Sequence, residues 1–111
     1  MSTVFGQIIE GKLPCKKVFE NERILAFHDI APQAPVHVLI VPKKLIPNLA
    51  GASDEDEAVL GECLTVARKI AQQLGIQNSY RVITNSGKES GQLVYHIHFH
   101  LLGGRPLGAL G

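Results

Sequence analysis

The spacing of apolar residues predicts two helices of very different length. Apolar residues at helical spacing follow Thr3, a residue type that caps helices, and Gly11 offers a left-handed stop, which predicts a short amphipathic helix between them. Ser53 followed by four acidic residues favours the start of a second helix, and Gly75 favours its end. Between them apolar residues recur at three- and four-residue spacing: Leu60, Leu64, Ala67, Ile70, Ala71 and Leu74.

Short apolar and β-branched runs predict the strands, which cover residues 18–19, 24–27, 36–41, 81–84 and 93–102. The first two flank the turn-like Asn21-Glu22 and predict a hairpin. The run 36–41 is apolar at nearly every position, which predicts burial on both faces, and Pro42 ends it. Strands around one dominant helix predict an α+β fold with a mainly antiparallel five-stranded sheet, and 111 residues suit a single domain over 1–111.

Composition excludes several classes of function. The 11 Lys and Arg against 10 Asp and Glu are scattered, so no basic stripe favours a nucleic acid polymer. Apolar runs stay far below the ~18 residues of a membrane span. The segment Met1–Phe5 lacks the pattern of a secretory signal, so we expect a cytoplasmic protein. Cys15 and Cys63 have no metal or redox spacing.

Three histidines recur at every second position near the C-terminus: His96, His98 and His100. Because side chains alternate along a strand, all three imidazoles are expected on one face. The residues between and beside them point to the core: Tyr95, Ile97, Phe99 and Leu101. A lone histidine is more often structural, but three polar rings on one face give up burial, which favours a functional role.

Two kinds of site remain open for this face. Neighbouring histidines ~7 Å apart along a strand could converge on zinc, but the outer two are ~13 Å apart, so a zinc site needs another ligand. The available ligands are His37, His28, Asp29 and Cys15. The alternative is a phosphate site, in which one neutral imidazole attacks phosphorus and its neighbours donate protons and hydrogen bonds.

A polar loop over residues 85–92 leads directly into the histidine face. It offers the amides of Asn85 and Gln92 and the flexible backbone of Gly87 and Gly91, which suits close approach to an anion. It lacks the pattern of a phosphate-binding P-loop, so its position beside the histidines carries the argument.

The segment 96–102 resembles the His-φ-His-φ-His-φ-φ signature (φ is apolar) of the histidine-triad superfamily. Further segments resemble its Hint branch, and the similarity extends from about Thr3 to Arg105. They are Phe27-His28-Asp29-Ile30, Pro32-Gln33-Ala34-Pro35, His37, Pro42-Lys43-Lys44, Gly91-Gln92, Val94-Tyr95 and Gly103-Gly104-Arg105.

The resemblance implies a HIT fold and a homodimeric hydrolase. Because imidazoles spread along a strand suit a phosphate better than one coordination sphere, we expect no metal or cofactor. Its substrates would be purine nucleoside 5′-phosphoramidates and related nucleotidyl anhydrides, cleaved through a covalent nucleotidyl-histidine. By matching position, His98 is the nucleophile and His100 contacts phosphate oxygens near the leaving group. His96 and His37 then orient and polarise the array.

The resemblance also implies the residues that hold the nucleotide. Asp29 matches the carboxylate that accepts hydrogen bonds from both ribose hydroxyls, although an Asx turn before Pro32 is the structural alternative. Ile30 flanks the sugar and base. The remaining nucleotide contacts fall on the loop and the triad: Asn85, Gly91, Gln92, Leu93, His98 and His100.

Leu93 departs from the family pattern, in which a polar residue often stands at this position and assists the leaving amine. Two other classes of function stay open: a purine nucleotide-binding regulatory module with vestigial catalysis, and a zinc protein.

Overall fold

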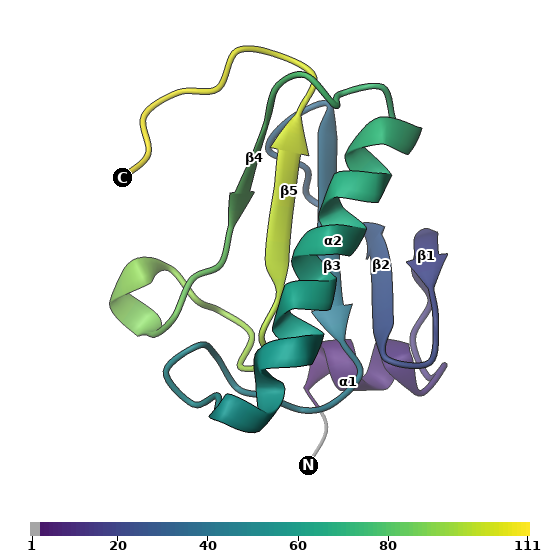
Figure 1. The fold of residues 1–111 in the computed structure, drawn as a ribbon, viewed down its shortest axis with the longest axis vertical. Coiled ribbons are helices and arrows are strands. Elements are labelled where there is room, and N and C mark those ends of the chain that lie inside the picture. The colour runs from purple at the N-terminus through teal and green to yellow at the C-terminus, as the bar shows by residue number, and fades with distance from the viewer. Residues whose placement is uncertain (1–2) are drawn as a thin grey trace.

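A five-stranded sheet lies at the centre of the fold in the computed structural model, which describes residues 3–111 (Figure 1). The strand order is β1-β2-β3-β5-β4, and the four pairs of neighbours are antiparallel. The strands are β1 (Lys17–Glu20), β2 (Ile24–His28), β3 (Val36–Pro42), β4 (Tyr80–Ile83) and β5 (Phe99–Gly103). Met1 and Ser2, at the start of the segment that lacks a secretory signal, lie outside the described residues.

Two helices flank the sheet, as the spacing predicts. The short helix α1 (Val4–Ile9) is capped by Thr3, whose hydroxyl accepts from the Gly6 N–H. The long helix α2 (Glu57–Gln73) follows a 3₁₀ turn η1 (Asp54–Asp56), and Gly75 just beyond it takes a φ of +77°. A second 3₁₀ turn, η2 (Lys88–Ser90), lies in the loop before β5. No helix of residues 3–111 is long and apolar enough to cross a membrane.

The sheet separates two apolar clusters. The α2 side buries alternate residues of the central strands, including Val38 and Ile40 of β3. The opposite side buries Phe5 of α1 with Leu39 and Val41 of β3. The strand β3 is therefore buried on both faces, as its continuous apolar run predicts.

The last strand is shorter than the sequence predicts. The pattern predicts a strand over 93–102, but β5 begins at Phe99, so only His100 of the three histidines lies in a strand. Side chains occupy the carbonyls that a strand here would offer to its neighbour. Val94 O accepts from Gln92 Nε2 (3.0 Å), His96 O from His98 Nδ1 (2.8 Å) and His98 O from Thr84 Oγ1 (2.8 Å).

The segment before β5 is instead held by the last residue of β3 and the loop that follows this strand. The Ile97 N–H donates to Ile46 O at 2.6 Å, and the His96 ring reaches Pro42 O at 2.7 Å. The predicted alternation holds from His96 onward, since Phe99 and Leu101 pack on the α2 side. It is wrong for Tyr95, which is 44% exposed rather than in the core.

Candidate active site

Histidines from two neighbouring strands meet on the face of the sheet that α1 covers. His37 lies near the start of β3, and His100 of β5 pairs with Leu39 two residues further along. The His37 and His100 rings have centroids 5.2 Å apart, and those of His98 and His100 are 5.1 Å apart. The sheet register therefore gathers residues that are about 60 positions apart in the sequence.

The hydrogen bonds fix which nitrogen of His37 and His100 carries the proton. The Gln33 N–H donates to His37 Nδ1 at 3.0 Å, so the neutral ring carries its proton on Nε2. That Nε2 lies 2.9 Å from His100 Nδ1 and donates to it. His100 in turn carries its proton on Nε2, where it is a donor toward the site.

The same reasoning applies to His98 and His96. His98 Nδ1 lies 2.8 Å from His96 O, and a carbonyl only accepts, so His98 carries its proton on Nδ1. His96 Nε2 donates to Pro42 O at 2.7 Å, and its Nδ1 lies 3.3 Å from Thr3 Oγ1. Among residues 3–111 no group donates to His98 Nε2, which therefore keeps a free lone pair, whereas both nitrogens of His96 are engaged.

Burial keeps the four rings neutral. Desolvation lowers the pKa of His37, His96 and His98 below 6.5, because a charged ring is poorly solvated there. For His100, burial and then the neighbouring His98 and His37 lower the pKa to about 4. Neutral imidazoles with assigned tautomers can act as a nucleophile and as hydrogen-bond donors.

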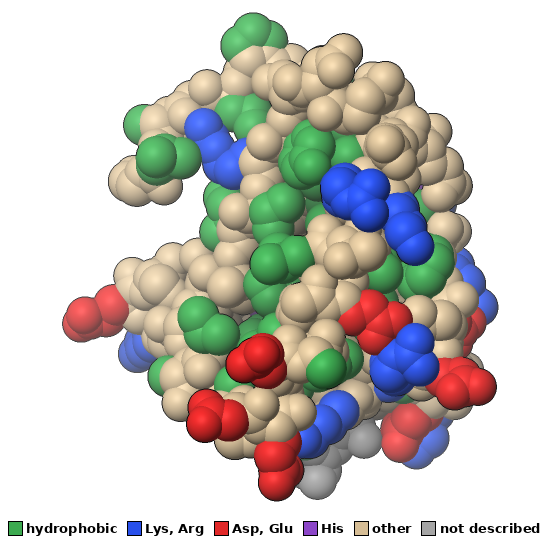
Figure 2. All heavy atoms as spheres, viewed as in Figure 1, with side chains coloured by type: hydrophobic (Ala, Val, Ile, Leu, Met, Phe, Trp, Pro, Cys, Tyr) green, Lys and Arg blue, Asp and Glu red, His purple; other side chains and the backbone are tan. Residues whose placement is uncertain are grey.

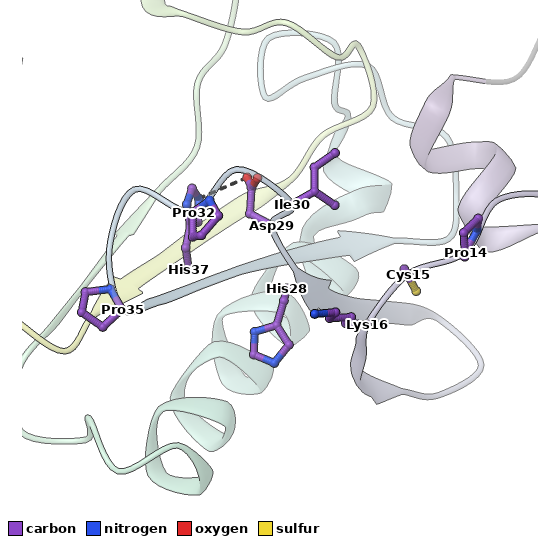
Figure 3. A pocket seen from close by; sticks show the side chains of 9 residues that line it. All are labelled: Pro14, Cys15, Lys16, His28, Asp29, Ile30, Pro32, Pro35 and His37. Carbon is purple, nitrogen blue, oxygen red and sulfur yellow. Dashed lines mark ion pairs between the residues drawn. The ribbon is translucent and has the colours of Figure 1, made fainter.

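A cavity of about 730 Å³ opens at the His37 end of the cluster, a size that suits a small ligand (Figure 3). Asp29 and His37 point toward one another, with Asp29 Oδ2 3.4 Å from His37 Nε2. Asp29 Oδ1 also accepts from the Ala31 N–H at 2.8 Å, which is the Asx turn expected as the structural alternative. The cavity is lined by Pro14, Cys15, Lys16, His28, Asp29, Ile30, Pro32, Pro35 and His37.

Some polar groups of the predicted phosphate loop are free to bind a ligand, and others are already hydrogen-bonded within the protein. Asn85 Nδ2 lies 4.0 Å from where a Cβ on Gly91 would stand, so these two predicted residues are neighbours. The Gln92 side chain is 3% exposed and fully engaged. Its Oε1 accepts from Gly87 N (2.9 Å) and Asn48 Nδ2 (3.1 Å), and its Nε2 donates to Pro47 O (2.8 Å) and Val94 O (3.0 Å). Gln92 therefore has no side-chain group to offer a ligand.

Leu93 and Ile30 are apolar and almost fully exposed, at 91% and 99%. Among residues 3–111 these side chains have little apolar surface to cover them, which is compatible with contact to a ligand. They are the two apolar side chains among the predicted contacts, and the fold leaves both open.

Asp29, His37 and His100 also form a group that could hold a metal ion, since their ligand atoms lie within 4.8 Å of one another. The 2.9 Å between His37 Nε2 and His100 Nδ1 is a hydrogen-bond distance, whereas two nitrogens on a tetrahedral zinc are about 3.3 Å apart. Proton sharing between the rings accounts for the geometry.

Several groups that hold the site cannot be recognised from the sequence pattern. The carbonyl of Pro42 and the N–H of Gln33 are backbone groups, which leave no mark in side-chain patterns. Thr84 holds His98 O, and a threonine at the end of a strand is too common to signal that role.

Residues 10–107 match the family model of the HIT domain. The chain belongs to the HIT family. Its resemblance to the histidine-triad superfamily is confirmed. The α+β HIT fold is likewise confirmed by solved structures.

Relatives and solved structures agree with this family. The purine nucleoside phosphoramidase of Escherichia coli K12 is 50% identical over 109 residues, covering 97% of this chain and 92% of that protein. A HIT-like protein of Chlamydia pneumoniae is 50% identical over 108 residues, covering 97% and 98%. A HIT family hydrolase from Legionella pneumophila superposes with a TM-score of 0.94 at 45% identity, covering 96% of each chain. Hydrolase is the class of enzyme that these relatives support.

Proposed function

We propose that this protein hydrolyses the P–N bond of purine nucleoside 5′-phosphoramidates, and related nucleotidyl anhydrides, through a covalent intermediate on His98. The observation that carries the proposal is the bond from His98 Nδ1 to His96 O, which leaves the Nε2 lone pair free for attack. The phosphoramidase name of the Escherichia coli relative, at 50% identity, supports the substrate class.

In the first step, His98 Nε2 forms a bond to phosphorus and the P–N bond breaks. The departing nitrogen needs a proton, because an amide anion is a very poor leaving group. His100 lies next to His98, and its Nδ1 accepts a hydrogen bond from the Nε2–H of His37. That hydrogen bond occupies His100 Nδ1, so the ring stays neutral and donates from Nε2 to a phosphate oxygen, while a water relays a solvent proton to the departing amine.

In the second step, water attacks phosphorus and the bond to His98 Nε2 breaks. The proton lost by water goes to the solvent, and the nucleoside monophosphate leaves. The His96 carbonyl stabilises positive charge on the His98 ring in both steps, because it accepts from Nδ1 throughout.

The nucleotide is held on both sides of this centre. Asp29 lines the cavity beside His37 and accepts from the ribose hydroxyls, while Ile30 covers the sugar and base. Asn85 and the backbone N–H of Leu93, neither of which has a hydrogen-bond partner among residues 3–111, donate to phosphate oxygens beside Gly91. Gln92 supports this loop through its four hydrogen bonds.

The experiment is turnover of adenosine and guanosine 5′-phosphoramidates by protein purified without a tag, before and after EDTA treatment. We expect hydrolysis that EDTA leaves unchanged and that His98→Ala abolishes. Binding of AMP without turnover would favour the regulatory module. Activity lost with EDTA and restored by zinc would favour the zinc protein.

A further inference from the structure

The hydroxyl of Thr3 joins the start of α1 to the histidine triad. Thr3 Oγ1 accepts from the Gly6 N–H at 3.0 Å as the N-cap of α1. The same oxygen lies 3.3 Å from Nδ1 of His96, 93 residues further along the chain. One hydroxyl therefore serves both the helix and the candidate active site.

The direction of this contact follows from the other side of the His96 ring. His96 Nε2 donates to Pro42 O, and the ring is only 1% exposed, so burial favours its neutral form. A neutral imidazole has one N–H, which leaves Nδ1 as an acceptor. The Thr3 hydroxyl must therefore donate to His96 Nδ1 while it accepts from Gly6.

Two consecutive histidines of the triad depend on α1. The His96 carbonyl accepts from His98 Nδ1, so the placement of His96 determines the orientation of the His98 ring. Phe5, in the first turn of α1, packs edge-on against His98 with ring centroids 4.8 Å apart, and against His96 at 6.5 Å. Thr3 and Phe5 thus hold the two histidines from the same turn of helix.

We propose that Thr3 is a positioning residue of the active site, whose hydroxyl fixes the orientation of His96 and, through the His96 carbonyl, the direction in which His98 Nε2 points. The consequence for catalysis rests on the proposed function. The consequence for the His96 ring does not.

Three variants separate this role from helix capping. Thr3→Ser keeps a hydroxyl that can both donate and accept. Thr3→Asp keeps a good helix cap but cannot donate to His96 Nδ1, and Thr3→Val removes both bonds. The measurements are thermal unfolding, ¹⁵N NMR shifts of the His96 ring, and kcat and KM with a purine nucleoside 5′-phosphoramidate.

For Thr3→Ser we expect wild-type behaviour in all three measurements. For Thr3→Asp we expect near wild-type unfolding, a fall in kcat of about tenfold with little change in KM, and a His96 ring that holds protons on both nitrogens. For Thr3→Val we expect both a lower unfolding temperature and a similar loss of kcat.

Wild-type kcat and an unchanged His96 ring in Thr3→Asp would overturn the proposal and leave Thr3 as a helix cap only. A kcat loss that Thr3→Ser shares with Thr3→Val would also overturn it. If the wild-type protein shows no turnover, the proposed function fails, and the His96 nitrogen shifts alone decide whether Thr3 positions the ring.

Discussion

At the scale of single residues, the direction of each histidine hydrogen bond determines what the cluster can do. Backbone groups decide these directions: an N–H at His37 and carbonyls at His96 and His98. The sequence predicts which histidines matter, because their spacing in the triad is visible. It does not predict the tautomers, because the backbone partners come from distant segments.

The lowered pKa values of the histidines predict an acid limb of activity below pH 6.5. His98 must be neutral to attack, and burial lowers its pKa from the ordinary 6.5. We expect kcat/KM, which reports the free enzyme, to stay level as the pH falls through 6.5 and to decline only at lower pH. A decline centred at or above 6.5 would contradict a buried neutral nucleophile.

The lowered pKa of His100 makes the folded protein less stable in acid. Below pH 6.5 the unfolded chain protonates His100, whereas the folded protein does so only near its pKa of about 4. The unfolded state therefore binds more protons, and the free energy of unfolding falls as the pH drops through this window.

Asp29 gives a prediction about the ribose. If its carboxylate accepts from two hydroxyls, Asp29→Ala should weaken AMP binding by about 1–3 kcal/mol, as for hydrogen bonds to a charged group, and should weaken 2′-deoxy-AMP less. Isothermal titration of both ligands with both proteins measures the difference. Equal losses for the two ligands would remove Asp29 from the ribose site.

At the scale of elements, the sequence predicts the helices and four strands closely, because caps, glycines and apolar spacing are local signals. The sequence pattern predicts too long a β5. The side chains of Gln92, His98 and Thr84 donate to backbone carbonyls that would otherwise pair with a neighbouring strand. That competition depends on loops that meet only in the folded chain. The resemblance identifies Gln92 as a site residue, and its four contacts show that the side chain supports the loop instead.

Gln92 therefore gives a prediction about loop stability. Gln92→Glu loses both donors to Pro47 O and Val94 O and buries a charge. We therefore expect chemical denaturation to show a free energy of unfolding lower by about 1–3 kcal/mol. The loss should shrink at low pH, where a protonated Glu regains one donor. Gln77→Glu makes the same change at an exposed position and should have little effect. Equal stability of the two variants would contradict the supporting role.

At the scale of the whole molecule, the sheet separates the histidine cluster from the face that α2 crosses. Figure 2 shows hydrophobic side chains reaching the surface on that face, and Leu64 of α2 is 51% exposed. The strand β4 lies at the edge of the sheet, with β5 as its neighbour. We propose that a second copy of the chain covers this apolar surface in a homodimer.

The homodimer is tested by mass in solution. We expect a wild-type mass twice the 12.0 kDa of the chain by light scattering, and a shift toward the monomer for Leu64→Glu. Gln73→Glu adds the same charge on the opposite side of α2 and should remain dimeric. A monomeric wild-type protein would refute the homodimer.

Covalent bonding of the nucleotide to His98 is tested by trapping the intermediate. The enzyme is mixed with a purine nucleoside 5′-phosphoramidate, quenched in base within the first turnover, and analysed by intact mass and peptide mapping. We expect a nucleoside monophosphate adduct on His98 Nε2 that is absent in His98→Ala, although this variant still binds AMP. Turnover in His98→Ala, or an adduct on another residue, would contradict it.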